Sequence, residues 1–322
     1  MKTFFVFSLL FIGGWELFWR FKGFVPNVTD DLGVWTLVRR SASLKGGKPV
    51  VIVGASRIQV GFHPDVFAAL TGIHPAVLAI DGSSPISVLE DLISDPTFKG
   101  NIICSLSPHC LVDGLESAEK SDKWVKKYRK QSRSFLVWTH LFAFFQGLFV
   151  FLYKNLTPVK IWSHLMERKW PHLPYIIMRS DRFRLADYSK VDLTKLRAAR
   201  EKRERQIHSE VRPLTKKQFF ERIKRIDKMA EQLENKDGQL VFIRFPSTGI
   251  IRKLEQETWP KKTFWDVFAD GTRAITIHFE DYPSLSGFHC PDGSHLDIKD
   301  AARFTRELVT IFSEKGFEPW KN

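Results

Sequence analysis

The chain has few cysteines and no spacing of cysteine and histidine that would hold a metal. Its 322 residues contain three cysteines, too few for a disulfide framework. The sequence also lacks a Walker loop and a GxGxxG fingerprint, which argues against the commonest nucleotide-binding sites. We therefore expect neither a metal nor an organic cofactor.

Acidic residues are scarce relative to basic ones, and the formal net charge is +13. Such an excess favours an anionic partner or surface, for example phospholipid head groups, an acidic polysaccharide or nucleic acid. A mildly basic, solvated surface is equally compatible. The most charge-rich stretch, residues 193–234, alternates basic residues with glutamates, which is typical of an exposed helix; an anion-binding face is the alternative. Because aromatic interleaving and nucleic-acid motifs are missing, we expect no nucleic-acid partner.

The N-terminal segment is a candidate membrane anchor. Lys2 precedes an apolar stretch from Thr3 to Trp19 that only Glu16 interrupts. Its length lies within the range of about 17–25 residues for a spanning helix. A small-residue cleavage site does not follow, so we expect residues 1–22 to form a retained anchor and not a cleaved signal peptide. A buried amphipathic helix is the alternative interpretation.

Five short apolar runs alternate with segments of helical periodicity, which predicts an α/β fold. A central parallel sheet covered on both faces explains strands that are apolar throughout. We expect one domain over residues 23–322, interrupted at about 112–238 by a helical insertion. Ligands of such sheets bind at the carboxyl ends of the strands. The five predicted strands are Val50–Val53, Val77–Ile80, Ile102–Leu106, Leu240–Phe245 and Ala274–His278.

Two short segments at opposite ends of the chain predict a catalytic triad. Gly54-Ala55-Ser56 follows the first strand, and Asp292-Gly293-Ser294-His295 precedes the last helix. A serine hydroxyl becomes a nucleophile when a base takes its proton, and a carboxylate orients that base. We therefore predict Ser56 as nucleophile, His295 as base and Asp292 as orienting acid. Each could instead be only a turn or helix-capping residue.

The strings GAS at 54–56 and DGSH at 292–295 resemble the nucleophile and DxxH blocks of the SGNH (GDSL-like) hydrolase and acyltransferase superfamily. The resemblance implies a flavodoxin-like three-layer sandwich. It also implies an oxyanion hole formed by the backbone N–H groups of Ser56 and Gly82. The sequence departs from the family in two places: Ala55 replaces an aspartate, and the family's GxND block is absent from residues 101–109.

Three further residues are candidate substrate contacts. Ser107 and His109 fall where the asparagine loop of the resembled family lies, and Arg57 directly follows the nucleophile. For Arg57, ordinary surface packing is an equally good interpretation.

The resemblance to membrane-anchored members of the superfamily implies a function and a location. We expect a single-pass protein of the inner or cytoplasmic membrane whose catalytic domain is extracytoplasmic. It would be a serine esterase or O-acyltransferase that acts on acyl esters of cell-envelope glycans or lipids, beside a membrane-bound O-acyltransferase. A catalytically silent scaffold or binding module in envelope polymer assembly is the alternative, and a cytosolic lipid-binding protein is a more distant one.

Two features leave alternatives open. The segment Phe135–Tyr153 is apolar enough to span a membrane, but one extra crossing would separate Ser56 from His295. We expect it to lie on the bilayer or cap the domain, with core packing as the alternative. Cys110 and Cys290 both flank predicted active-site loops, so they either form a bridge or remain free.

Overall fold

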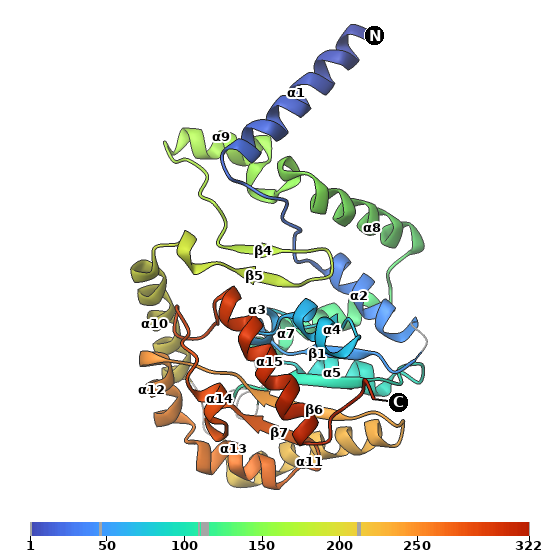
Figure 1. Ribbon diagram of the computed structural model, residues 1–322, viewed down its shortest axis with the longest axis vertical. Coiled ribbons are helices and arrows are strands. Elements are labelled where there is room, and N and C mark those ends of the chain that lie inside the picture. The colour runs from blue at the N-terminus through green and yellow to red at the C-terminus, as the bar shows by residue number, and fades with distance from the viewer. Residues whose placement is uncertain (1, 45–46, 109, 111–115, 211–213, 322) are drawn as a thin grey trace.

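A five-stranded parallel sheet forms the centre of the protein (Figure 1). The computed structural model describes residues 2–44, 47–108, 110, 116–210 and 214–321. The strands lie in the order β2-β1-β3-β6-β7, which is the flavodoxin-like order 2-1-3-4-5 when only the strands of this sheet are counted. Their bounds are β1 Val50–Val53, β2 Ala76–Val77, β3 Asn101–Ser105, β6 Leu240–Arg244 and β7 Ile275–His278.

Two hydrophobic cores, one on each face of the sheet, explain why the strands are apolar throughout. Val51 and Val53 of β1 belong to one core, and Val50 and Ile52 belong to the other. The first core is covered by α2 (Leu32–Leu44), α5 (Ile86–Ser94), α11 (Lys216–Glu234) and α13 (Lys261–Asp270). The second is covered by α3 (Ser56–Gly61), α4 (Pro64–Thr71), α14 (Pro283–Ser286) and α15 (Ile298–Glu314). The predicted α/β architecture with five parallel strands is confirmed, but the second strand, predicted over Val77–Ile80, is Ala76–Val77.

The insertion between β3 and β6 contains a β-hairpin as well as helices. The prediction of a wholly helical insertion was wrong at this point, because strands of three residues are too short to show an alternating pattern. Arg182 in the hairpin turn has a left-handed φ of 67° and donates to the carbonyls of Val77 and Ala79, which ties the hairpin to β2. The elements are α7 (Glu116–Tyr128), α8 (Arg133–Leu148), η1 (Val150–Leu152), η2 (Lys154–Leu156), α9 (Pro158–Met166), β4 (Ile176–Met178), β5 (Arg184–Ala186), η3 (Tyr188–Lys190) and α10 (Leu193–Glu210). After β6 follow α12 (Gly249–Thr258) and, beyond β7, η4 (Phe279–Asp281).

Helix α1 (Lys2–Phe21) projects from the body, and only its C-terminal part is packed (Figure 1). Trp19 is fully buried in a small core with Val150 and Leu156. The Glu16 carboxylate accepts the backbone N–H groups of Val150 and Phe151 at 3.1 and 3.0 Å. In the described part of the chain, no helix combines the length and the hydropathy that a membrane crossing requires.

Candidate active site

Ser56 lies at the carboxyl edge of the sheet, at the first position of α3. The chain leaves β1 through Gly54, whose φ is +149°. A Cβ at this position would lie 2.6 Å from Cγ2 of Ile58 and 3.0 Å from Cβ of Ser105. Glycine is therefore required for the close turn from strand to helix that presents the Ser56 side chain.

Asp292 and His295 are held in a turn that the aspartate itself closes. Oδ1 of Asp292 accepts the backbone N–H groups of Ser294 and His295 at 2.9 and 2.8 Å. This Asx turn fixes the carboxylate, and its other oxygen faces the imidazole ring. Both side chains are buried, with residue exposures of 1% for Asp292 and 4% for His295.

The three predicted residues form one hydrogen-bonded chain. His295 Nε2 lies 2.8 Å from Ser56 Oγ, and His295 Nδ1 lies 2.8 Å from Asp292 Oδ2. A carboxylate can only accept, so Nδ1 carries the proton and Nε2 is free to accept the proton of the serine hydroxyl. The predicted contacts among these residues are confirmed, although 239 positions separate Ser56 from His295.

The charges of the site favour a neutral base. Burial lowers the pKa of His295, and the partly opposing interaction with Asp292 does not restore it. Burial raises the pKa of Asp292, but the hydrogen bond and charge of His295 and the charge of Arg200 outweigh it, and the pKa lies well below its usual range. At neutral pH the site therefore holds an ionised carboxylate and a neutral imidazole, the form that can remove a proton.

Two residues of the insertion reach the Asp292 carboxylate, and sequence reasoning missed both. The Tyr188 hydroxyl and the Arg200 Nε donate to Asp292 Oδ2 at 3.2 and 3.1 Å. Burial and the nearby Asp292 charge raise the pKa of Tyr188, so the phenol stays protonated and able to donate. Arg200 lies in the stretch predicted as an exposed helix. The sequence carries no signal for its contact with a residue 92 positions away.

The backbone N–H groups of Ser56 and Gly82 are the predicted donors to a negatively charged oxygen. Ser56 is in the first turn of α3, where N–H groups lack an intrahelical acceptor and the helix dipole is positive. Gly82 follows β2, the neighbour of β1, in a left-handed conformation with φ +66°. Within the described residues neither N–H has a hydrogen-bond partner. Arg184 of the hairpin pairs with Asp81 at 3.0 Å and so fastens this loop.

Of the three candidate substrate contacts, the structure describes Arg57 and Ser107. Arg57 has a side chain only 10% exposed and donates to Glu255 at 2.5 Å, so one side of its guanidinium is occupied. Ser107 is buried, and its carbonyl accepts the Cys110 N–H at 2.9 Å. His109 lies outside the described residues.

All three cysteines are free and buried, so the bridge between Cys110 and Cys290 is not formed. The two lie in cores on opposite faces of the sheet. The Cys290 thiol donates instead to the Pro246 carbonyl at 3.4 Å. Burial raises the pKa of Cys290 to about 12 and that of Cys110 to about 11, which makes both thiols unreactive.

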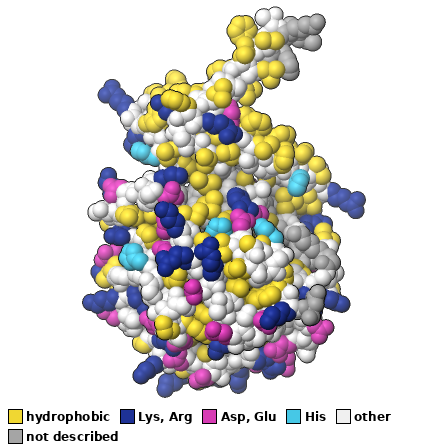
Figure 2. All heavy atoms as spheres, viewed as in Figure 1, with side chains coloured by type: hydrophobic (Ala, Val, Ile, Leu, Met, Phe, Trp, Pro, Cys, Tyr) yellow, Lys and Arg dark blue, Asp and Glu magenta, His cyan; other side chains and the backbone are white. Residues whose placement is uncertain are grey.

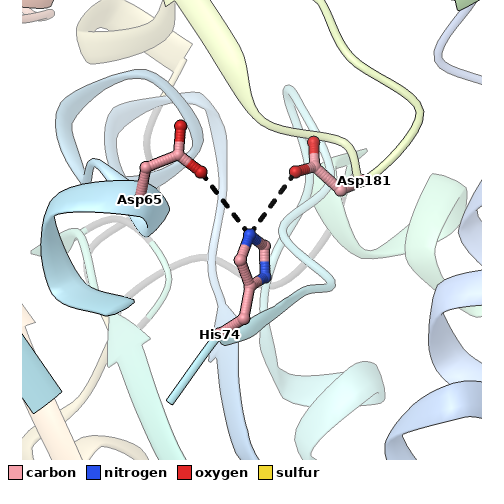
Figure 3. Close-up of side chains that lie close together, drawn as sticks. All are labelled: Asp65, His74 and Asp181. Atoms are coloured by element: carbon pink, nitrogen blue, oxygen red, sulfur yellow. Dashed lines mark ion pairs between the residues drawn. The ribbon is translucent and has the colours of Figure 1, made fainter. Parts of the chain in front are cut away.

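One cluster of possible metal ligands lies outside this site, at the turn between β4 and β5. His74 Nε2 is 3.5 Å from a carboxylate oxygen of Asp65 and 3.7 Å from one of Asp181 (Figure 3). Arg179 donates to both carboxylates and supplies the positive charge between them. The cluster therefore works as an ion-pair network that joins the hairpin to α4, and we assign no metal to it.

No protein-family model matches the sequence, and no curated protein matches it. What the protein does must therefore be argued from the geometry of Ser56, His295 and Asp292.

Proposed function

We propose that the protein is a membrane-associated serine esterase or O-acyltransferase of the SGNH type. Ser56 attacks the carbonyl carbon of an acyl ester while His295 takes the hydroxyl proton. The N–H groups of Ser56 and Gly82 stabilise the oxyanion. His295 returns the proton to the departing alkoxide, and an alcohol leaves. Water or an acceptor hydroxyl then attacks the acyl-Ser56 ester with His295 as base, which releases the acid or the new ester and restores the serine.

The observation that carries this proposal is the hydrogen-bonded chain from Ser56 through His295 to Asp292, with both distances at 2.8 Å. The lowered pKa of His295 supports it, because a base must be unprotonated to act. Tyr188 and Arg200 add support, since both donate to Oδ2 of Asp292, the oxygen that His295 also contacts.

The substrate class and location follow from the resemblance and remain part of the proposal. The substrates are acyl esters of cell-envelope glycans or lipids, and the natural partner is a membrane-bound O-acyltransferase. Helix α1 attaches the protein to the inner or cytoplasmic membrane, with the catalytic domain outside. Its support is the exposure of Phe7, Leu10 and Phe11, which are 68%, 68% and 71% exposed. Large apolar side chains are seldom so exposed in one continuous patch unless another surface covers them.

A fluorophosphonate probe tests the proposed chemistry directly. The full-length protein should be labelled covalently, and Ser56→Ala should lose the label completely, because the probe reacts only with an activated serine. Ser286→Ala, which changes an exposed serine of α14, should label like the wild type. A folded wild-type protein that takes up no label would favour the catalytically silent scaffold. A label that persists in Ser56→Ala would place the nucleophile elsewhere.

Arg200→Gln should shift the acidic limb of the kcat/KM profile to higher pH. The positive charge of Arg200 contributes to the lowered pKa of His295, so its removal raises that pKa. The base is then protonated at a higher pH and activity is lost earlier as the pH falls. We also expect a loss of about tenfold in kcat/KM on p-nitrophenyl acetate, the size of one charged hydrogen bond.

Arg203→Gln is the matched control, since Arg203 is exposed on the same helix. An unchanged acidic limb in Arg200→Gln, even with lower activity, would mean that Arg200 has only a structural role.

A further inference from the structure

Helix α8 has its amphipathic pattern inverted. The side that packs on the body carries Thr139 and Gln146, which are 8% and 3% exposed. Gln146 exchanges hydrogen bonds with Thr29, accepting its backbone N–H and donating to its hydroxyl, both at 3.2 Å. The outer side carries Trp138 and Phe145, which are 64% and 44% exposed. In water this helix would bury its apolar side. The environment of its outer side is therefore apolar.

The segment that follows α8 continues the same exposed surface. We call the outer side chains of α8 and of residues 149–173 the apolar face. Trp162 and Leu165 of α9 are 67% and 54% exposed, and Trp170 beyond it is 49% exposed. Figure 2 shows hydrophobic side chains gathered at the end of the molecule that carries α1. An apolar face of this extent marks an interaction surface.

The apolar face is joined to the base of α1. Arg20 of α1 donates to the Leu148 carbonyl at the end of α8 at 2.6 Å, and it also pairs with Glu16 at 2.6 Å. Because Glu16 binds the backbone of η1 as well, α1 and the apolar face keep a fixed relation. Helices α1, α8 and α9 therefore lie together at one end of the molecule (Figure 1).

The charges beside the apolar face select the occupant. Residues 133–173 contain a single acidic residue, Glu167, and a set of basic ones: Arg133, Lys154, Lys160, Arg168 and Lys169. Basic residues that border an apolar face rich in tryptophan match the head groups and acyl chains of an anionic bilayer. Helix α1 shows the same combination of apolar and basic residues. One bilayer accounts for both α1 and the apolar face, whereas a protein partner of the apolar face would not account for α1.

We propose that the apolar face lies in the boundary between head groups and acyl chains of an anionic bilayer, while the exposed residues of α1 enter the same leaflet. The protein then has two membrane contacts, and the second fixes how the body is oriented. This holds whether or not Ser56 is an active nucleophile, so it does not depend on the proposed chemistry.

Quenching by lipids with brominated acyl chains tests the proposal. The full-length protein is reconstituted into vesicles of phosphatidylcholine and phosphatidylglycerol, and tryptophan fluorescence is compared with and without bromine. The variant with both Trp138→Phe and Trp162→Phe should lose about half of the quenching, because Trp15 and Trp170 remain near the lipid. The control is Trp320→Phe, which packs on Phe67 in the catalytic domain and should leave quenching unchanged.

Phenylalanine keeps both positions apolar, and near-ultraviolet circular dichroism of each variant verifies that it is folded. Quenching in the double variant equal to that in the wild type would overturn the proposal. It would show that the face meets no acyl chains and that a second copy or another protein covers it instead. Fluorophosphonate labelling of the same samples reports separately on the proposed activity.

Discussion

Ser56→Ala and His295→Gln should each reduce kcat for p-nitrophenyl acetate by about 10^4- to 10^6-fold, and the double variant should be no slower than either. The reason is that Ser56 and His295 act as one unit through the 2.8 Å contact between Oγ and Nε2. Without Ser56 the imidazole has no nucleophile to activate. Without His295 the serine hydroxyl has no acceptor for its proton. Turnover and burst kinetics of the purified variants measure this.

Asp292→Asn should cost about 10^4-fold through a different mechanism. The amide offers an N–H to Nδ1 and thereby favours the imidazole tautomer that carries its proton on Nε2, facing Ser56. Ser286→Ala should behave like the wild type. If the losses of Ser56→Ala and His295→Gln multiplied in the double variant, the two residues would not belong to one mechanism.

Glu255→Gln should lower the free energy of unfolding by about 3–5 kcal/mol. The Glu255 carboxylate is 3% exposed and accepts from Arg57, Arg244 and the Ser247 hydroxyl, each at 2.5 Å. An amide at this position leaves two buried guanidinium groups without a counter-charge. Urea denaturation of the full-length protein in detergent measures the change.

The effect of Glu255→Gln should depend on pH. Burial raises the pKa of Glu255, but Arg244 and Arg57 outweigh it and the pKa lies well below its usual range. The carboxylate therefore stabilises the fold above the unfolded pKa of about 4.3, and this contribution is lost as the pH falls toward the folded pKa. The variant and the wild type should thus approach each other in acid. Glu257→Gln, at an exposed position of the same helix, should have little effect; a loss as large as that of Glu255→Gln would contradict the argument.

The sheet and the triad could be predicted because their signals are local. Runs such as Val50–Val53 are apolar throughout since both faces are buried, and that pattern needs no knowledge of the partner strands. Asp292 and His295 belong to one turn, and Ser56 belongs to another. Each part of the triad can therefore be recognised from a short sequence motif. What joined the halves was the resemblance to the SGNH superfamily, whose nucleophile block follows the first strand and whose DxxH block lies near the C-terminus.

The contacts of the insertion could not be predicted, because they depend on how the insertion packs against the turn that carries Asp292 and His295. Arg200 is one of several arginines in a charged helix, and nothing local distinguishes it from Arg203. Only the structure shows that Arg200 and Tyr188 meet Asp292. The same limit applies to α8: its sequence is apolar on several sides, and only packing shows that Gln146 points inward.

The burial of Glu16 and Trp19 decides where the chain can be shortened for biochemical or crystallographic work. A protein that begins at residue 23 would leave the N–H groups of Val150 and Phe151 without their carboxylate. It would also open a hole the size of an indole beside Leu156. A protein that begins just before Glu16 keeps these contacts and still removes Phe7, Leu10 and Phe11, three large apolar side chains that are each at least 68% exposed. The useful cut therefore falls inside α1, before Glu16.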